Sequence, residues 1–206
     1  MSELIFYLLT LPAIAIVVTI HEYTKAIVSS KLGDKVPAEN GRLTLNPLKH
    51  LEPIGAICML FAGVGWGQPT PTSPMYYKDR KRDTILTYTL PSIANLFVGI
   101  AVAVIAAAFH INFIDIAVQN NLFFYYIYIF LLQIALLNVK MALFNLIPIY
   151  PLDASRVLAC FLSPKHAMQM SQYEKILQMI LIILVFLGIA SAVIDPLARL
   201  ILFFLF

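Results

Sequence analysis

Long apolar stretches alternate with short polar ones over most of the chain, and the longer ones are candidate membrane-spanning helices. A run of about twenty apolar residues is enough to cross a bilayer as a helix. The apolar stretch from Leu51 to Trp66 is shorter and contains Pro53 and several glycines, so we predict that it enters the membrane and returns. We predict spans over 4–28, 84–109, 122–148 and 178–193.

The polar segments and the end of the chain give weaker signals. Asp195-Pro196 is expected to end the last span, and the apolar piece 197–206 is too short to cross by itself. Residues 41–47 alternate apolar and polar positions and close with an Asn-Pro turn, a pattern typical of a short strand. Residues 68–74 are proline-rich and predicted to be extended.

The composition indicates a membrane protein. Hydrophobic residues make up 61% of the chain and charged residues 12%, whereas soluble domains carry about a quarter charged residues. We therefore expect an all-α integral membrane protein with one domain over 1–206. It would be a helical bundle of about four to six membrane segments with a small β-like insertion at the cytoplasmic face. No basic cluster precedes the first apolar run, so we expect no cleavable signal.

Basic residues are concentrated in a few polar stretches. All of the fourteen lysines and arginines except Lys25, Lys140 and Arg199 lie in 29–50, 76–83 and 153–175. By the positive-inside rule these stretches face the cytoplasm, so 51–67 must return to its starting side and 110–121 must face outward. The dense cluster 78–83 is short and next to a span, which indicates a helix anchor and no nucleic-acid partner.

The first predicted span ends in two ionisable residues, His21 and Glu22, where such groups are costly and usually functional. A zinc protease motif HExxH has a second histidine at the position that Lys25 occupies here. The predicted topology brings Asp153 to the same end of the bundle. A His-Glu pair alone is weak evidence, and an acid after a proline-rich helix end is usually a turn residue.

The combination of motifs is more specific. The chain resembles the site-2 protease family of intramembrane zinc metalloproteases, of the short prokaryotic type, roughly from residue 10 to 190. The segments that carry the resemblance are, in order, His21-Glu22, GRLTLNP at 41–47, GWGQPTPTSP at 65–74, IAN at 93–95 and FNLIPIYPLDASRVL at 144–158.

The resemblance implies a role for each matching residue. His21 and Asp153 would be zinc ligands, and Glu22 would be the general base that deprotonates the metal-bound water. Asn145 would donate a hydrogen bond to the developing oxyanion. The β-like segment 41–47 would receive an unwound substrate as an added strand. Asn46 and Asn95 would contact that substrate, and the site would lie near the cytoplasmic face of a bacterial plasma membrane.

The chain also departs from the family pattern. Lys25 replaces the second histidine ligand, Leu152-Asp153-Ala154 lacks the glycine of LDG, and Leu90 to Asn95 lacks the Gly-Pro of the small-residue element. Hydrolytic zinc sites generally keep three protein ligands, and an ammonium is a poor ligand that repels a cation. His50 and His166 lie on the same side of the predicted bundle and are the alternatives for a replacement ligand.

Two hypotheses follow for Lys25. It replaces the zinc electrostatically by neutralising Glu22 or Asp153, or it extends to the membrane surface and contacts neither acid.

The favoured function is therefore that of an inactive or impaired protein that binds transmembrane segments of partner membrane proteins within the lipid bilayer. The alternative is an active zinc metalloprotease that cleaves membrane-spanning substrates in regulated intramembrane proteolysis. The cofactor is zinc in the active form and none otherwise. A third class is a small transporter, with Lys140, Asn138 and Asn145 along its pathway.

Overall fold

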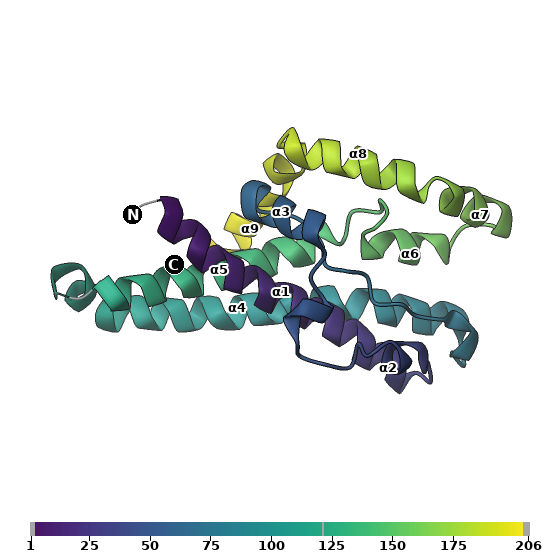
Figure 1. Cartoon of the computed structure of the whole chain (residues 1–206), viewed down its shortest axis with the longest axis horizontal. Coiled ribbons are helices and arrows are strands. Elements are labelled where there is room, and N and C mark those ends of the chain that lie inside the picture. Colours follow the sequence, from purple (N-terminus) through teal and green to yellow (C-terminus); the bar gives the residue numbers. More distant parts are fainter. Residues whose placement is uncertain (1–2, 121, 204–206) are drawn as a thin grey trace.

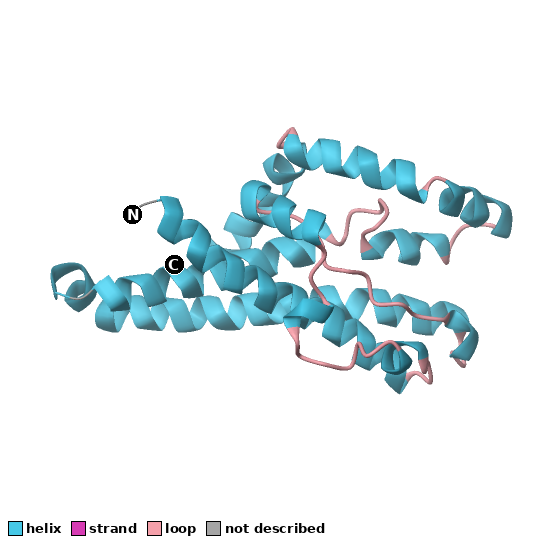
Figure 2. Ribbon diagram, viewed as in Figure 1, coloured by secondary structure: helices cyan, strands magenta, loops and turns pink. Residues whose placement is uncertain are grey.

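The computed structural model describes residues 3–120 and 122–203, without the side chains of 111–120. Figure 2 shows helices joined by loops, and no strand occurs in this described part of the chain. The predicted all-α fold class is confirmed. The α-helices are α1 (Glu3–Lys31), α2 (Val36–Glu39), α3 (Pro53–Ala62), α4 (Arg80–Asn120), α5 (Leu122–Phe144), α6 (Asp153–Ala159), α7 (Pro164–Gln172), α8 (Glu174–Phe186) and α9 (Ile189–Phe203), with short 3₁₀ helices η1 (Pro47–Lys49) and η2 (Pro74–Tyr76).

Three helices of the described chain, α1, α4 and α5, are long and apolar enough to cross a membrane. They lie side by side and form the main bundle (Figure 1). The α8–α9 pair, bent by 67°, makes a fourth span if it is counted as one. Helices α4 and α5 pack closely because Gly99 of α4 has no side chain: a Cβ there would lie 2.8 Å from Val139 of α5. The chain is thus a multi-pass membrane protein, with three or four candidate spans where about four to six membrane segments were predicted.

Helix α3 and the segment after it correspond to the stretch that was predicted to enter the membrane and return. The Glu52 carboxylate accepts a hydrogen bond from the backbone of Gly55 and caps the start of α3, and Gly63, with φ 71°, ends the helix. The chain then returns against the helix it has just left. A Cβ at Gly65 would lie only 2.1 Å from the carbonyl oxygen of Gly55, so this return requires glycine.

The strand predicted over 41–47 is wrong. Arg42 lies at the centre of this segment, with its backbone N–H bonded to Pro37 and its guanidinium bonded to the carbonyl of Lys49. His50 holds the carbonyl of Thr44 at 2.7 Å. The segment is therefore a loop fixed by contacts within residues 37–50. No second strand pairs with it in the described chain, and an isolated strand is not stable.

The predicted break at Asp195-Pro196 is also wrong. Both residues lie inside α9, and the break occurs at Gly188, between α8 and α9. Gly188 has φ 74°, a left-handed conformation that glycine adopts without cost and that commonly ends helices. The residues 110–121 predicted to face outward continue α4 as far as Asn120, and residue 121 lies outside the described residues.

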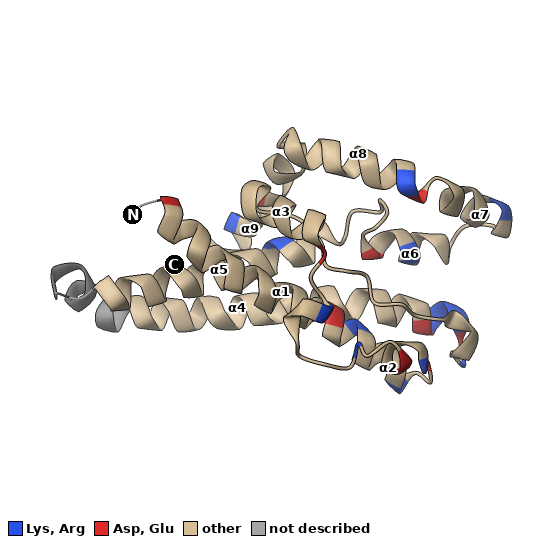
Figure 3. Cartoon of the chain, viewed as in Figure 1, with Lys and Arg blue, Asp and Glu red and all other residues tan. Residues whose placement is uncertain are grey.

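Charged residues gather at one end of the bundle, around α2, the start of α4 and helices α6 to α8 (Figure 3). Lys140 of α5 lies away from this end and pairs with Asp195 of α9 at 2.8 Å. Most of the length of α1, α4 and α5 carries no charge, as expected for helices in contact with lipid.

Candidate functional site

Four polar side chains lie close together near the charged end of the bundle. His21, Glu22 and Lys25 come from one turn and a half of α1, where a three- or four-residue spacing places side chains on one face. Asp153 is the first residue of α6, and all four side chains are buried. Residues more than 130 positions apart in the sequence therefore form one cluster.

His21 is completely buried, and both of its ring nitrogens face oxygen atoms. Nε2 lies 2.9 Å from the Asp153 carboxylate, and Nδ1 lies 2.9 Å from the side-chain oxygen of Asn95. The orientation of Asn95 is fixed because its amide nitrogen donates to the carbonyl of Val17 and to Asn138. Each ring nitrogen of His21 therefore faces an acceptor, the Asp153 carboxylate on one side and the Asn95 amide oxygen on the other.

Lys25 bridges the two acids. Its ammonium lies 2.7 Å from the Asp153 carboxylate and 3.1 Å from the Glu22 carboxylate. It also lies 5.5 Å from the centre of the Tyr88 ring, within the range of a cation–π contact. Only 2% of Lys25 is exposed, so it does not extend to the surface. The ammonium therefore offsets negative charge on both carboxylates, which reduces the cost of burying them.

Glu22 has no free oxygen in this arrangement. One carboxylate oxygen contacts Lys25, and the other accepts the backbone N–H of Thr70 at 2.7 Å. The Thr70 hydroxyl also donates to the carbonyl of Glu22. Sequence reasoning did not identify Thr70, because a threonine in a proline-rich loop carries no signal of its own.

Asp153 is held as an anion. Burial alone would raise the pKa of this carboxyl group, but Lys25 and His21 outweigh burial and hold the pKa below its usual value. Its backbone N–H lies 3.4 Å from the side-chain oxygen of Asn145. The Asn145 amide nitrogen donates to the carbonyl of Met141, so Asn145 links α5 to the start of α6. The side-chain amide of Asn145, predicted to donate to an oxyanion, thus donates to a carbonyl of the preceding helix α5.

The remaining predicted residues lie in different places. Asn95 belongs to the cluster through His21, and Asn138 supports Asn95 from α5. Asn138 was detectable in the sequence as an amide in an apolar span, although its partner could not be predicted. Asn46 is exposed and caps η1 by accepting from Leu48, away from the cluster.

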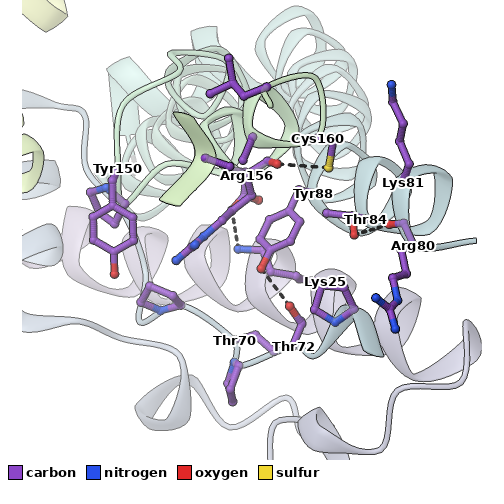
Figure 4. A pocket seen from close by; sticks show the side chains of 18 of the residues that line it. Lys25, Thr70, Thr72, Arg80, Lys81, Thr84, Tyr88, Tyr150, Arg156 and Cys160 are labelled. Carbon is purple, nitrogen blue, oxygen red and sulfur yellow. Dashed lines mark hydrogen bonds and ion pairs between the residues drawn. The ribbon is translucent and has the colours of Figure 1, made fainter. Parts of the chain in front are cut away.

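A cavity of about 940 Å³ opens beside the cluster, with Lys25 and Asp153 in its lining. The proline-rich segment from Pro69 to Pro74 lines it together with Tyr88 of α4 (Figure 4). Helix α6 contributes Arg156, which lies near Tyr150 in the same view. The Thr72 hydroxyl hydrogen-bonds that of Tyr88 at 2.8 Å, so the loop and α4 are joined next to the cavity.

The donor set of the cluster does not fit a hydrolytic zinc site. Such a site uses three protein ligands, whereas the third position here holds an ammonium. No group of three His, Cys, Asp or Glu residues within 3–120 and 122–203 is placed to hold a metal ion. His50 contacts the carbonyl of Thr44 and His166 contacts Ser163, and neither belongs to such a group of three in the described part of the chain.

Fold and site together define a class of protein: a multi-pass α-helical membrane protein with a buried cluster of histidine, lysine and two acids at one end of its bundle. The profile of "Peptidase family M50" matches residues 51–188, a range that contains Asn95, Asn138 and Asp153 and begins after Lys25. The chain belongs to peptidase family M50, and the resemblance to site-2 proteases is confirmed.

A curated relative agrees with this assignment. The chain is 32% identical over 181 residues to the protein named "Putative zinc metalloprotease YwhC" of Bacillus subtilis (strain 168), which covers 86% of this chain and 80% of the relative. No solved structure matches the chain significantly.

Proposed function

We propose that this chain is a non-hydrolytic member of family M50 that binds transmembrane segments of partner membrane proteins. The observation that carries the proposal is the ammonium of Lys25, which lies between the carboxylates of Glu22 and Asp153. In the family's chemistry Glu22 would accept a proton from water. Here both of its oxygens are occupied, by Lys25 and by the backbone of Thr70.

Electrostatics also opposes a metal at this place. Two unit charges about 4 Å apart interact by roughly 4 kcal/mol at an effective dielectric constant of about 20, so a doubly charged ion beside Lys25 would be repelled by roughly 8 kcal/mol. Structural zinc sites with four ligands gain about 10–16 kcal/mol on binding. A site with one ligand fewer and an adjacent ammonium retains little of that gain.

The cavity supports a binding role without hydrolysis. Its volume of about 940 Å³ is in the range of ligand-binding cavities, and it adjoins the buried cluster at the charged end of the bundle. We infer that this end faces the cytoplasm, because it carries most of the basic residues. A helical segment of a partner would approach between the spans and present its cytoplasmic end to the cavity.

Metal content and cleavage test the proposal. The purified chain is expected to contain less than about 0.1 zinc per molecule by elemental analysis, and Lys25→His is expected to bring this close to one. Lys175→His, at an exposed position of α8, is the matched control and should bind no zinc. The unmodified chain should capture a transmembrane reporter helix by photo-crosslinking without cleaving it, with or without a chelator.

The opposite outcome is equally clear. One tightly bound zinc in the unmodified chain, with reporter cleavage that Glu22→Ala abolishes, would make the protein an active metalloprotease. That outcome would agree with the name of the Bacillus subtilis relative.

A further inference from the structure

The cavity next to the cluster has an excess of positive charge in its lining. Arg80 and Lys81 at the start of α4 line it, and neither has an ion-pair partner among the described residues. In the view of Figure 4 they lie on one side of Lys25 and Tyr88, with Arg156 on the other side. Arg156 is already paired with Glu174 of α8 at 2.9 Å.

The nearby acids do not cancel this charge within the cavity. Asp79 caps α4 by accepting the backbone N–H groups of Lys81 and Arg82, and Asp83 accepts that of Asp79. Neither acid lines the cavity. Asp153 does line it, but it is bound to Lys25 and His21. Arg80 and Lys81 therefore have no carboxylate partner among the described residues, and Lys81 lies only against the ring of Phe161, 4.2 Å from its centre, so both can bind an incoming anion.

The loop that lines the cavity has few backbone N–H groups free to bind a guest segment. Pro69, Pro71 and Pro74 have no N–H group, and the N–H groups of Thr70 and Ser73 are bonded to Glu22 and Asp34. Within the described chain only Thr72 keeps a free amide in this segment. A guest cannot add to this segment as a strand in a regular ladder, so its side chains must supply the specificity.

We propose that the cavity selects transmembrane segments whose cytoplasmic flank is acidic, and that Arg80 and Lys81 recognise the flank. This inference rests on the proposed function and names the class of partner. Most membrane proteins carry lysine and arginine on the cytoplasmic side of their spans, and the cavity repels such flanks. An acidic flank therefore distinguishes a minority of membrane proteins from the rest.

The test measures binding of two fluorescent helical peptides to the full chain in phosphatidylcholine nanodiscs. The peptides share an apolar core of about twenty residues and differ only in three glutamates or three lysines at one flank. The acidic peptide is expected to bind roughly tenfold more tightly. The double variant R80E/K81E should abolish or invert this preference. The matched control is Arg82→Glu, an exposed neighbour that does not line the cavity, and it should keep the preference.

The possible results separate this inference from the proposed function. Three results would overturn recognition of the acidic flank and leave the proposed binding of transmembrane segments intact. They are equal affinity for the two peptides, a preference for the acidic peptide that persists in R80E/K81E, and a preference that Arg82→Glu removes to the same extent. Binding of neither peptide would overturn both proposals. Displacement of the acidic peptide by phosphatidylglycerol, lost in R80E/K81E, would make a lipid headgroup the occupant and would also overturn the inference.

Discussion

Among the described residues, Lys25 is the single cation that touches both buried acids of the site, so its removal should have a large effect on stability. Lys25→Met keeps most of the volume of the side chain but leaves Glu22 and Asp153 without their shared ammonium. Loss of one partner from a buried ion pair costs about 3–5 kcal/mol, because a charge remains buried and uncompensated. We expect Lys25→Met to lower the free energy of unfolding by about this amount, measured by denaturant titration in detergent micelles.

A double variant checks the electrostatic origin of this loss. Glu22→Gln removes one negative charge and keeps an oxygen that can accept the Thr70 amide. Lys25→Met with Glu22→Gln should therefore be more stable than Lys25→Met alone. Lys175→Met, at an exposed position, should change stability by less than about 0.5 kcal/mol. A loss below about 1 kcal/mol for Lys25→Met would show that the bridge contributes little.

For the individual residues of the site, the sequence predicts which side chains lie close together but not how they contact one another. The motif positions and the charge distribution predict that His21 and Asp153 lie at the same end, and the structure places them 2.9 Å apart. The contacts of Thr70 with Glu22 and of Asn138 with Asn95 depend on the path of a loop and on the rotation of α5. Neither is encoded in local spacing, so both require the three-dimensional structure.

Among the helices, the ion pair between Lys140 of α5 and Asp195 of α9 joins the bent α8–α9 unit to the bundle. The two charges differ in exposure: the side chain of Lys140 is 11% exposed and that of Asp195 is 34% exposed. Asp195→Asn would leave a buried ammonium, whereas Lys140→Met would leave a carboxylate that water can reach. We expect the free energy of unfolding to fall by about 2 kcal/mol for Asp195→Asn and by less than about 1 kcal/mol for Lys140→Met.

Thermal unfolding in detergent distinguishes these two variants. Arg199→Gln is the control, since Arg199 is exposed on the same helix as Asp195 and forms no ion pair with a described residue. Arg199→Gln should leave the midpoint temperature of unfolding nearly unchanged. A larger loss for Lys140→Met than for Asp195→Asn would mean that the packing of the lysine, rather than its charge, holds α5 and α9 together.

Helix α3 and the segment that returns against it give a prediction about close backbone contact. Alanine at position 65 would place its Cβ 2.1 Å from the carbonyl oxygen of Gly55, and backbone on both sides cannot move aside easily. We expect Gly65→Ala to cost about 3 kcal/mol or to prevent folding. Gly41→Ala is the matched control, because Gly41 has φ 63° but no atom within 4 Å of the added Cβ.

Gly41→Ala should cost only about 1–2 kcal/mol, from backbone strain alone. Both losses are read from the same denaturant titration. Equal losses for the two variants would argue that α3 and the returning segment are loosely packed.

The order of helices is largely predictable from the sequence, and the irregular segments are not. Apolar length predicts α1, α4 and α5, and the interrupted stretch after Leu51 predicts the return of the chain. The alternation over 41–47 suggested a strand, but a strand needs a neighbour and none is available in the described chain. Pro196 suggested a break, yet prolines are tolerated inside membrane helices and the left-handed Gly188 makes the break.

Over the whole molecule, the uneven distribution of charge determines which end of the bundle holds the site. Most of the basic residues gather at one end (Figure 3), and Arg80 and Lys81 at that end line the cavity together with Lys25 and Asp153 of the cluster. Because basic residues are retained in the cytoplasm, the proposed orientation makes the site accessible from inside the cell. The proposals on guest segments and on their acidic flanks both assume this orientation, so it needs a direct measurement.

Cysteine labelling in intact cells supplies that measurement. In a chain with Cys58→Ala and Cys160→Ala, single cysteines would replace Lys78, an exposed residue in the loop just before α4, and His110, an exposed residue near the far end of that helix. An impermeant maleimide should label Lys78→Cys only after the cells are permeabilised, and His110→Cys beforehand. About thirty residues of helix at 1.5 Å each separate the two sites, which is enough to cross the hydrocarbon core. The reverse pattern would place the cavity outside the cell, and the argument that basic flanks are the common competitors would no longer hold.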